Sequence, residues 1–392
     1  MLFHGIFKKY SKYIYQLKFT TYEATWKMCS LSHSKVLLTF RRLSCLRSQI
    51  LVLRGVTQDV SSSTFKRLKL PGNKDPLPVF MEEEVQSILN RITGVDLKKA
   101  AEIQPTLKPN KPVFKVIPEK ELRRLQAEAV KTQRIQIEQR PPFMSPRKEI
   151  NVELARNPEI APVMTNNLLF IDTSAYTRPE RANKDKAVIV RDTEGTLRKA
   201  KHDERERAIQ IAFPVKGRTV FPSHFFSPEY LQNALENCRY SYVLDKVCVQ
   251  YEPDDPEFIR ISCHIFDHIL ERGEFDFLRG TRHFGSLVFY LALCRRDRPL
   301  VLDMLQRHLV LDACDVIQLV KKIHTPKEQS KFLPYTTKTI QRTLEKYILK
   351  VTNQEENRKF NEAMENIKSR GLSEVIEVNK SERDLIENYL KQ

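Results

Sequence analysis

Prolines are concentrated in one part of this 392-residue chain, and they limit what that part can fold into. Nine of the 21 prolines lie between Pro105 and Pro162. Proline fixes φ and lacks the backbone N–H, so this segment cannot form a long helix or a central strand. One helix fits, beginning at Glu119 after Pro118 and ending before Pro141. The remainder must be extended, either as a free linker or as an arm on a partner surface, and its apolar islands favour the arm.

A second short helix is predicted before this proline-rich segment. It begins near Phe80, has acidic residues in its first turn, where the helix dipole favours them, and ends at Gly94. Residues 65–166 are therefore predicted to form an extended proline-rich arm with two short helices.

Strand and turn signals alternate in the next segment, residues 167–222. Its apolar runs contain the β-branched residues that favour strands, and Gly195 supplies the unusual dihedral angles of a turn. A charged helix is predicted over residues 203–213. The segment therefore reads as a small α+β module, too short for a doubly wound sheet. The predicted strands are residues 167–172, 187–192 and 197–200.

Helical patterning is clearest in residues 223–330. Ser227 followed by Pro228 is a typical helix start, and further Pro- and Gly-containing breaks divide the segment. No fixed repeat period is found, so a repeat solenoid is not established. Residues 331–392 continue as a helical tail with two apolar stripes. The predicted fold is mainly α, a helical-hairpin array with a small α+β module before it and an extended N-terminal arm. The predicted core helices are residues 228–237, 240–251, 256–271, 278–294, 299–310 and 311–324.

Positive charge is unevenly distributed along the chain. The 66 Lys and Arg exceed the 49 Asp and Glu by 17, and residues 1–70 alone carry +11. Residues 1–64 are basic, rich in Ser and Thr, nearly free of acids and partly amphipathic, which predicts an organelle transit segment and leaves a basic surface helix or tail as the alternative. No run of about 18–20 apolar residues escapes a Lys or Arg, so no membrane span is predicted.

Catalytic patterns are not found in the sequence. Only 10 glycines are present, and no phosphate-binding loop, zinc-protease, hydrolase or kinase motif occurs. His264 and His268 share a helix face but lack a third ligand, so two ordinary histidines are favoured over a metal site. The acidic group around Asp255 is read as a helix cap beside Pro256. No catalytic, cofactor-binding or metal site is predicted, and no small-molecule substrate.

Clusters of cations give the one binding signal that can be read from the residues. They lie at residues 66–69, 198–201, 216–218 and 279–283, and such groups bind phosphate backbones without reading base sequence. A single cluster of this kind is more often a solvated surface, and no aromatic sheet motif for RNA occurs. The candidate RNA contacts are Arg198, Lys199, Lys201, Lys216 and Arg218.

Four stretches, residues 80–97, 188–214, 250–254 and 272–290, resemble the family of mitochondrial small ribosomal subunit protein twenty-two, one of the mitochondrion-specific ribosomal proteins. They occur in order, and the resemblance covers roughly residues 80–325. It implies a structural component of the mitochondrial small ribosomal subunit, in the matrix, with neighbouring ribosomal proteins and small-subunit rRNA as partners. It brings no catalytic residues, and the tail does not share it.

One alternative from the residues alone stays open. The hairpin-like helices also fit an organellar helical-array factor that binds or processes RNA. An enzyme is a third hypothesis that would require a cleft with convergent polar groups.

Overall fold

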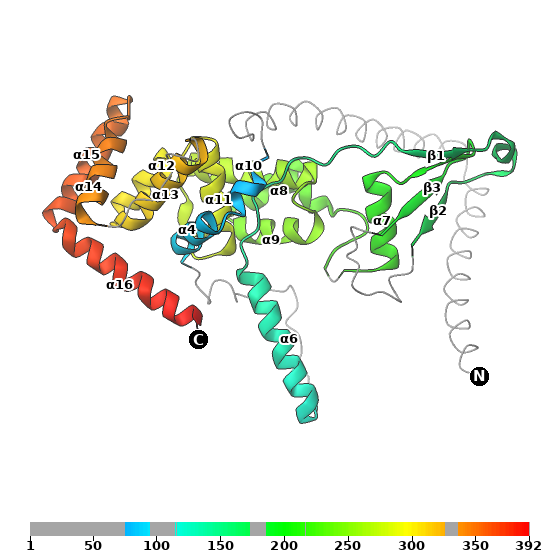
Figure 1. The fold of residues 1–392 in the computed structure, drawn as a ribbon, viewed down its shortest axis with the longest axis horizontal. Coiled ribbons are helices and arrows are strands. Elements are labelled where there is room, and N and C mark those ends of the chain that lie inside the picture. The colour runs from blue at the N-terminus through cyan, green and yellow to red at the C-terminus, as the bar shows by residue number, and fades with distance from the viewer. Residues whose placement is uncertain are drawn as a thin grey trace, which may run out of the picture. The chain divides into compact units, whose positions relative to one another are not determined.

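The computed structural model describes residues 75–94, 114, 116–172, 186–215, 217–325 and 336–391. The predicted transit segment, residues 1–64, and the basic cluster at residues 66–69 lie outside these ranges. The described part is mostly helical and contains a four-stranded antiparallel sheet (Figure 1). The predicted fold class is therefore confirmed.

The helical core follows the predicted helices closely. Its central helix, α11, is buried on every side beyond its first residue, as expected for a helix that is apolar all round. It packs against α13, which also packs against α12. The elements of this core are η4 (His224–Phe226), α8 (Pro228–Glu236), α9 (Tyr240–Gln250), α10 (Pro256–Arg272), η5 (Phe275–Phe277), α11 (Arg282–Leu293), α12 (Arg298–Gln306) and α13 (Val310–His324).

Three tight connections in the core turn through a left-handed residue that is not glycine. These residues are Cys238 between α8 and α9, Arg295 between α11 and α12, and His308 between α12 and α13, with φ of 54°, 55° and 62°. In each case the following backbone N–H reaches back to a carbonyl of the preceding helix, as in a Schellman cap. The core therefore makes these three turns without glycine, a residue that is scarce in this chain.

The first helices of the arm are part of the core. α3 (Leu77–Phe80) and α4 (Glu83–Thr93) follow one another, and α4 packs against both α11 and α13. Phe80 meets Phe289 of α11 edge to face, with ring centroids 5.1 Å apart. Gly94 adopts φ 51° and ends α4, as the sequence predicts.

The helix predicted after Pro118, α6 (Glu119–Ile137), leads into an extended stretch over residues 138–150. Phe143 in this stretch is only 3% exposed, and Met144 N donates to Pro253 O at 2.9 Å. Neither a free linker nor an arm on a partner describes it, because it covers the chain's own helical core.

The sheet has the strand order β1-β4-β3-β2, and α7 covers one of its faces (Figure 1). Three strands and the helix were predicted, but β1 was not. Gly195, with φ 81°, is required at its turn because a Cβ there would stand 2.2 Å from Asn157 O. The elements are β1 (Glu153–Arg156), η1 (Pro158–Val163), β2 (Leu168–Ile171), β3 (Val188–Arg191), β4 (Thr196–Lys199) and α7 (His202–Ala212).

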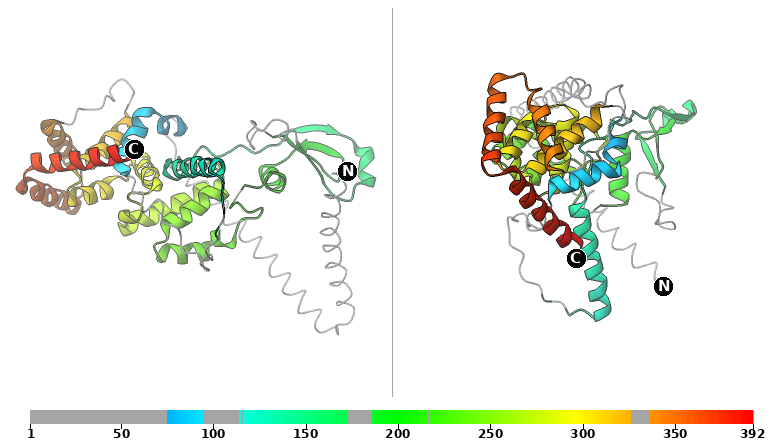
Figure 2. Two further views of the ribbon diagram at one scale, coloured as in Figure 1. Left: turned by 90° about the horizontal axis from the view of Figure 1, so that it is seen from below. Right: turned by 60° about the vertical axis from the view of Figure 1, so that its left-hand side comes forward.

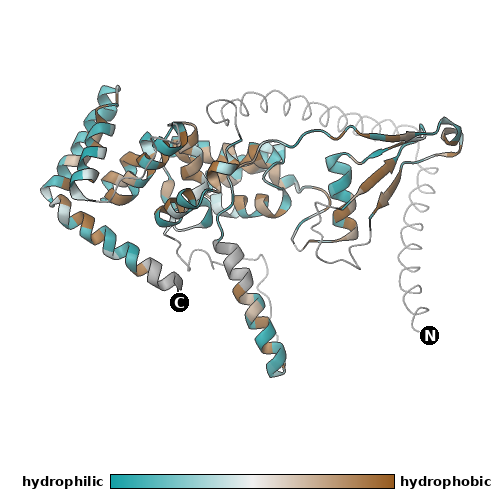
Figure 3. Cartoon of the chain, in the orientation of Figure 1, coloured by the Kyte–Doolittle hydropathy of each residue, from teal (hydrophilic) through white to brown (hydrophobic). Residues whose placement is uncertain are grey.

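The C-terminal tail contains α14 (Thr337–Ile348), α15 (Gln354–Ser369) and α16 (Leu372–Lys391) (Figure 2). These helices pack on α12 and α13. The two predicted apolar stripes are their packing faces. α15 is otherwise mostly hydrophilic (Figure 3). The buried stripe residues are Ile340, Leu344, Ile348, Phe360, Met364 and Ile367.

Candidate nucleic-acid interface

The predicted RNA contacts lie around the sheet and α7, and the structure describes four of the five. Arg198 and Lys199 end β4, and Lys201 precedes α7. Arg218 follows α7 in the connection to the helical core, and Lys216 lies outside the described residues.

Arg198 is held by a carboxylate of its own module. Its Nη1 and Nη2 donate to Glu204 Oε2 and Oε1, both at 2.8 Å, which is the two-bond geometry that suits guanidinium and carboxylate. The hydrogen bond from Arg198 lowers the pKa of Glu204 to about 2. The charge of Arg198 is therefore already compensated within the fold.

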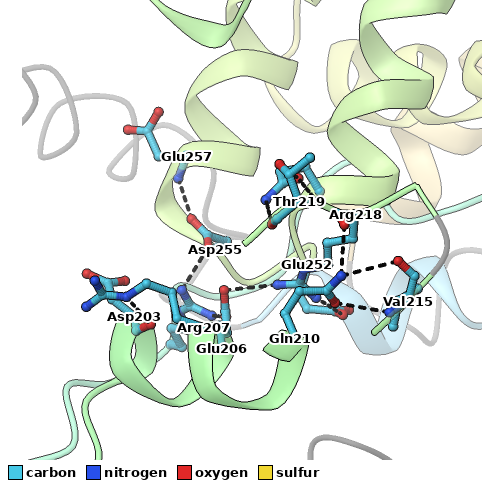
Figure 4. Close-up of polar contacts among 12 residues, drawn as sticks. Asp203, Glu206, Arg207, Gln210, Val215, Arg218, Thr219, Glu252, Asp255 and Glu257 are labelled. Carbon is cyan, nitrogen blue, oxygen red and sulfur yellow. Dashed lines mark hydrogen bonds and ion pairs between the residues drawn. The ribbon is translucent and has the colours of Figure 1, made fainter. Parts of the chain in front are cut away.

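Arg218 is also paired with carboxylates, and its ion pairs join α7 to the segment that follows α9. Its guanidinium lies 3.0 Å from Glu206 of α7 and 3.5 Å from Glu252, which follows α9 (Figure 4). Arg147 of the extended stretch binds the same Glu206 and also lies 2.7 Å from Asp255 at the start of α10. Two arginines and three carboxylates thus form a network that we call the junction: Arg147, Glu206, Arg218, Glu252 and Asp255.

Amide side chains reinforce the junction at the backbone. Gln210 Nε2 of α7 donates to Arg218 O at 2.8 Å (Figure 4). Gln250 Oε1 of α9 accepts from Thr219 N at 3.0 Å. Gln250 Nε2 in turn donates to Thr219 O at 3.0 Å. The connection between α7 and the helical core is therefore fixed to both by hydrogen bonds to its main chain.

Asp255 caps α10 and is also a member of the junction. Its Oδ1 accepts from Glu257 N at 2.8 Å, which confirms the capping interpretation. Burial raises the pKa of Asp255 to about 6, although Arg147 and the capping bond pull it down. Sequence alone gave no signal for the contact with Arg147, which lies 108 positions earlier.

Lys199 and Lys201 differ from these arginines because both are exposed. Within the described ranges neither side chain forms an ion pair, although the charge of Lys201 helps to lower the pKa of Glu204. They are the two predicted contacts whose charge is available to a phosphate. Of the five predicted residues, Arg198 and Arg218 are therefore paired with carboxylates, Lys199 and Lys201 are exposed, and Lys216 is not described.

The basic cluster at residues 279–283 is compensated as well. Arg279 lies 2.8 Å from Asp303 and 3.2 Å from Asp276. Arg282 and His283 both bind Asp245 of α9, with His283 Nε2 at 2.9 Å from its carboxylate. This cluster ties the start of α11 to α9.

Neither a metal centre nor a membrane span is found among the described residues. His268 Nδ1 lies 3.2 Å from Tyr240 Oη and so belongs to a hydrogen bond in the core. The residues with a described position include no group of three His, Cys, Asp or Glu placed to hold a metal ion. Among the described helices, none combines the length and apolar content needed to cross a membrane.

The fold and the junction define a mainly helical scaffold protein, in which ion pairs fasten a small sheet module to a helical array. The family model described as Mitochondrial 28S ribosomal protein S22 matches residues 78–325, more than half of the chain. The chain therefore belongs to the mitochondrial 28S ribosomal protein S22 family, and the predicted family and mitochondrial location are confirmed.

Two curated relatives agree with this assignment, and both are named small ribosomal subunit protein mS22. The Mus musculus protein is 37% identical over 254 residues, covering 64% of this chain and 68% of the relative. The Bos taurus protein is 36% identical over 278 residues, covering 71% and 73%.

Proposed function

We propose that this chain is a structural component of the mitochondrial small ribosomal subunit and supports mitochondrial translation. It acts by contacts with neighbouring ribosomal proteins and small-subunit rRNA, and not as an enzyme. The family match over residues 78–325 carries the proposal. The junction supports it, because a network of partly buried ion pairs holds the sheet module and the helical core in a fixed relation.

An exposed apolar strand supports the contact with a protein neighbour. Leu168, Leu169 and Phe170 of the edge strand β2 are each about half exposed, at 50%, 48% and 50%. An edge strand with apolar side chains and unpaired backbone groups favours association with another chain.

Sedimentation tests the proposal as a whole. Mitochondria that express the tagged chain are lysed, the ribosomal subunits are separated on a sucrose gradient, and the fractions are probed for the tag and for small-subunit rRNA. The tag should follow the small subunit. A tag that stays at the top of the gradient contradicts the proposal, and crosslinks to discrete messenger or transfer RNAs favour an RNA-processing factor instead.

We propose that RNA contacts the chain near the sheet, at Lys199 and Lys201 first and at Arg198, Lys216 and Arg218 in addition. Lys199→Gln/Lys201→Gln should weaken binding to small-subunit rRNA fragments and reduce the slope of log affinity against log salt by about 1.5. Lys368→Gln/Lys380→Gln, exposed positions in α15 and α16, is the control of equal charge. Equal loss in both variants would mean that only the net charge matters.

A further inference from the structure

A groove lies between the core and the tail, at α13, α14 and the connection that precedes α12. Its volume is about 630 Å³. Its apolar lining residues are Ile317 and Val320 of α13 and Val351 after α14. α13 and α14 pack against one another, so the groove belongs to a fixed contact between two helices. We call it the basic groove, because its cationic lining residues are Arg295, Arg298, Lys321, Arg342, Lys346 and Lys350.

The charges of the basic groove are not balanced from within. Its one acidic lining residue, Asp297, is 5% exposed and accepts a hydrogen bond from Tyr347 Oη at 2.6 Å. Arg298 lies 3.4 Å from Glu356 of α15. In the part of the chain with described positions, the other five cations have no acidic partner. The arginines of the junction, by contrast, each bind two carboxylates.

Three of these five cations lie on or just after α14. Arg342 and Lys346 are spaced four residues apart, which places them about 6 Å from one another on the same side of the helix, and Lys350 follows two residues after α14 ends at Ile348. Like charges at this spacing destabilise a helix. Arg295 and Lys321 add positive charge from two other elements, so an anion with regularly repeated charges would relieve the repulsion.

A phosphate backbone has the chemistry that this arrangement fits. Three of the five unpaired cations are lysines, which act as point charges and do not require the planar geometry of a carboxylate. The exposed Lys and Arg side chains of the lining are of the kind that contact phosphate oxygens. Binding there would therefore be insensitive to sequence and sensitive to salt.

We propose that the basic groove binds the phosphate backbone of an RNA strand without base specificity. This site is separate from Lys199 and Lys201, and α14 lies beyond the segment that the family model matches. Only the identity of the RNA, small-subunit rRNA, rests on the proposed function; the binding of an RNA backbone does not.

The test measures RNA binding by the purified full chain. Two labelled 20-nucleotide single-stranded RNAs of unrelated sequence are titrated at several salt concentrations between 50 and 200 mM. The variant is Arg342→Gln/Lys346→Gln/Lys350→Gln, in which all three positions are exposed. The control of equal charge is Lys338→Gln/Arg358→Gln/Lys359→Gln, which changes exposed positions of α14 and α15 outside the basic groove.

The groove variant should bind both RNAs about tenfold more weakly at 50 mM salt, with a slope of log affinity against log salt smaller by about 2. The control should stay within about twofold of the parent chain. Helical content and melting temperature are measured for all three proteins to confirm equal folding.

Three results would overturn the proposal: unchanged affinity in the groove variant, equal loss in the control, or an acidic polypeptide such as polyglutamate displacing RNA from the groove at equal charge concentration. The last result would assign the groove to an acidic protein. The experiment contains no ribosome, so its failure would leave subunit membership intact, and failed co-sedimentation would leave RNA binding by the groove intact.

Discussion

At the scale of single residues, Arg147 is notable because it joins two separate parts of the fold. It comes from an extended stretch, yet its guanidinium binds one carboxylate on α7 and another at the start of α10. Removing one partner from a buried ion pair is destabilising, because the other charge is left without compensation. Arg147 would keep Glu206 as a partner if Asp255 were neutralised, whereas Arg147 is the cation that is paired with Asp255. The two ends of the Arg147–Asp255 pair should therefore respond differently to substitution.

Arg147→Ala should lower the free energy of unfolding by about 3 kcal/mol, because Asp255 would remain buried without its cation. Asp255→Asn should change it by about 1 kcal/mol or less at pH 7, since Asn caps a helix about as well as Asp. Urea unfolding of both variants gives these values. Equal destabilisation by the two substitutions would contradict the argument.

The pH dependence gives a second readout of the same carboxyl. Because burial raises the pKa of Asp255 to about 6, the folded chain binds a proton there between about pH 4 and pH 6 that the unfolded chain releases. The contribution of this group to stability is therefore present below about pH 4 and is lost as the pH rises through about 6. Asp255→Asn should remove that contribution from the curve.

Gly285 and Gln139 lie in close contact. A Cβ at Gly285 would stand 2.2 Å from Gln139 Oε1. Gln139 Nε2 donates to Thr93 Oγ1 at 2.7 Å and to Leu89 O at 3.2 Å, so displacing it would break two buried hydrogen bonds.

Gly285→Ala should destabilise the parent chain by about 1 kcal/mol, because the lost hydrogen bonds outweigh the better helix propensity of alanine. In a Gln139→Ala background the same change should stabilise the chain, since the space is then free and only the propensity remains. Thermal or urea unfolding of the four proteins completes the cycle. The same sign in both backgrounds would show that Gln139 is not the obstacle.

At the scale of elements, ion pairs between helices set how the core responds to acid. Asp245 of α9 binds Arg282 and His283, the first two residues of α11. Burial opposes ionisation of this carboxyl, but the hydrogen bond from His283 and the charge of Arg282 lower its pKa to about 2. The charged form is thus favoured by folding.

The sign follows from the lowered pKa. Asp245 contributes stability above about pH 4, and this contribution is lost as the pH falls towards 2. Asp245→Asn should lower the melting temperature at pH 7, and the difference from the parent chain should shrink in a series down to pH 2. Asp384→Asn, an exposed position in α16, should leave the curve unchanged. A constant gap across the series would contradict the role of Asp245.

The same scale shows what the sequence could and could not predict. Helices α8 to α13 were predicted because capping residues, proline breaks and apolar periodicity are local signals. Strand β1 was missed because it reads ELAR, all four of its residues are exposed, and its identity depends on pairing with β4. The junction was missed for a related reason: Arg147 and Glu206 are 59 positions apart, and no local pattern marks their contact.

At the scale of the whole described chain, α13 contacts one helix far before it and another after it in the sequence, α4 and α16. Asp315 of α13 is fully buried and lies 3.4 Å from Arg91 of α4 and 2.8 Å from Arg383 of α16. α4 lies more than 200 residues before α13, whereas α16 follows it. A buried carboxylate between two arginines therefore couples the folding of α4 and the tail to that of the core.

Asn379 extends this coupling to the backbone. α13 has no capping side chain of its own, since Leu309 precedes its first residue. Instead, Asn379 Oδ1 of α16 accepts from Val310 N at 3.0 Å, which supplies from another helix the acceptor that a local cap would provide. The start of α13 is therefore satisfied only while the tail is docked.

Asn379→Ala should lower the free energy of unfolding by about 2 kcal/mol, because the cap is lost and a buried N–H is left without a partner. It should also increase hydrogen exchange at the first turn of α13 and along α16 together, since each end of this contact holds the other. Val378→Ala changes the neighbouring residue, which is 51% exposed, and should alter neither quantity appreciably. Faster exchange confined to α16, with α13 unchanged, would show that the tail docks on α13 without capping it.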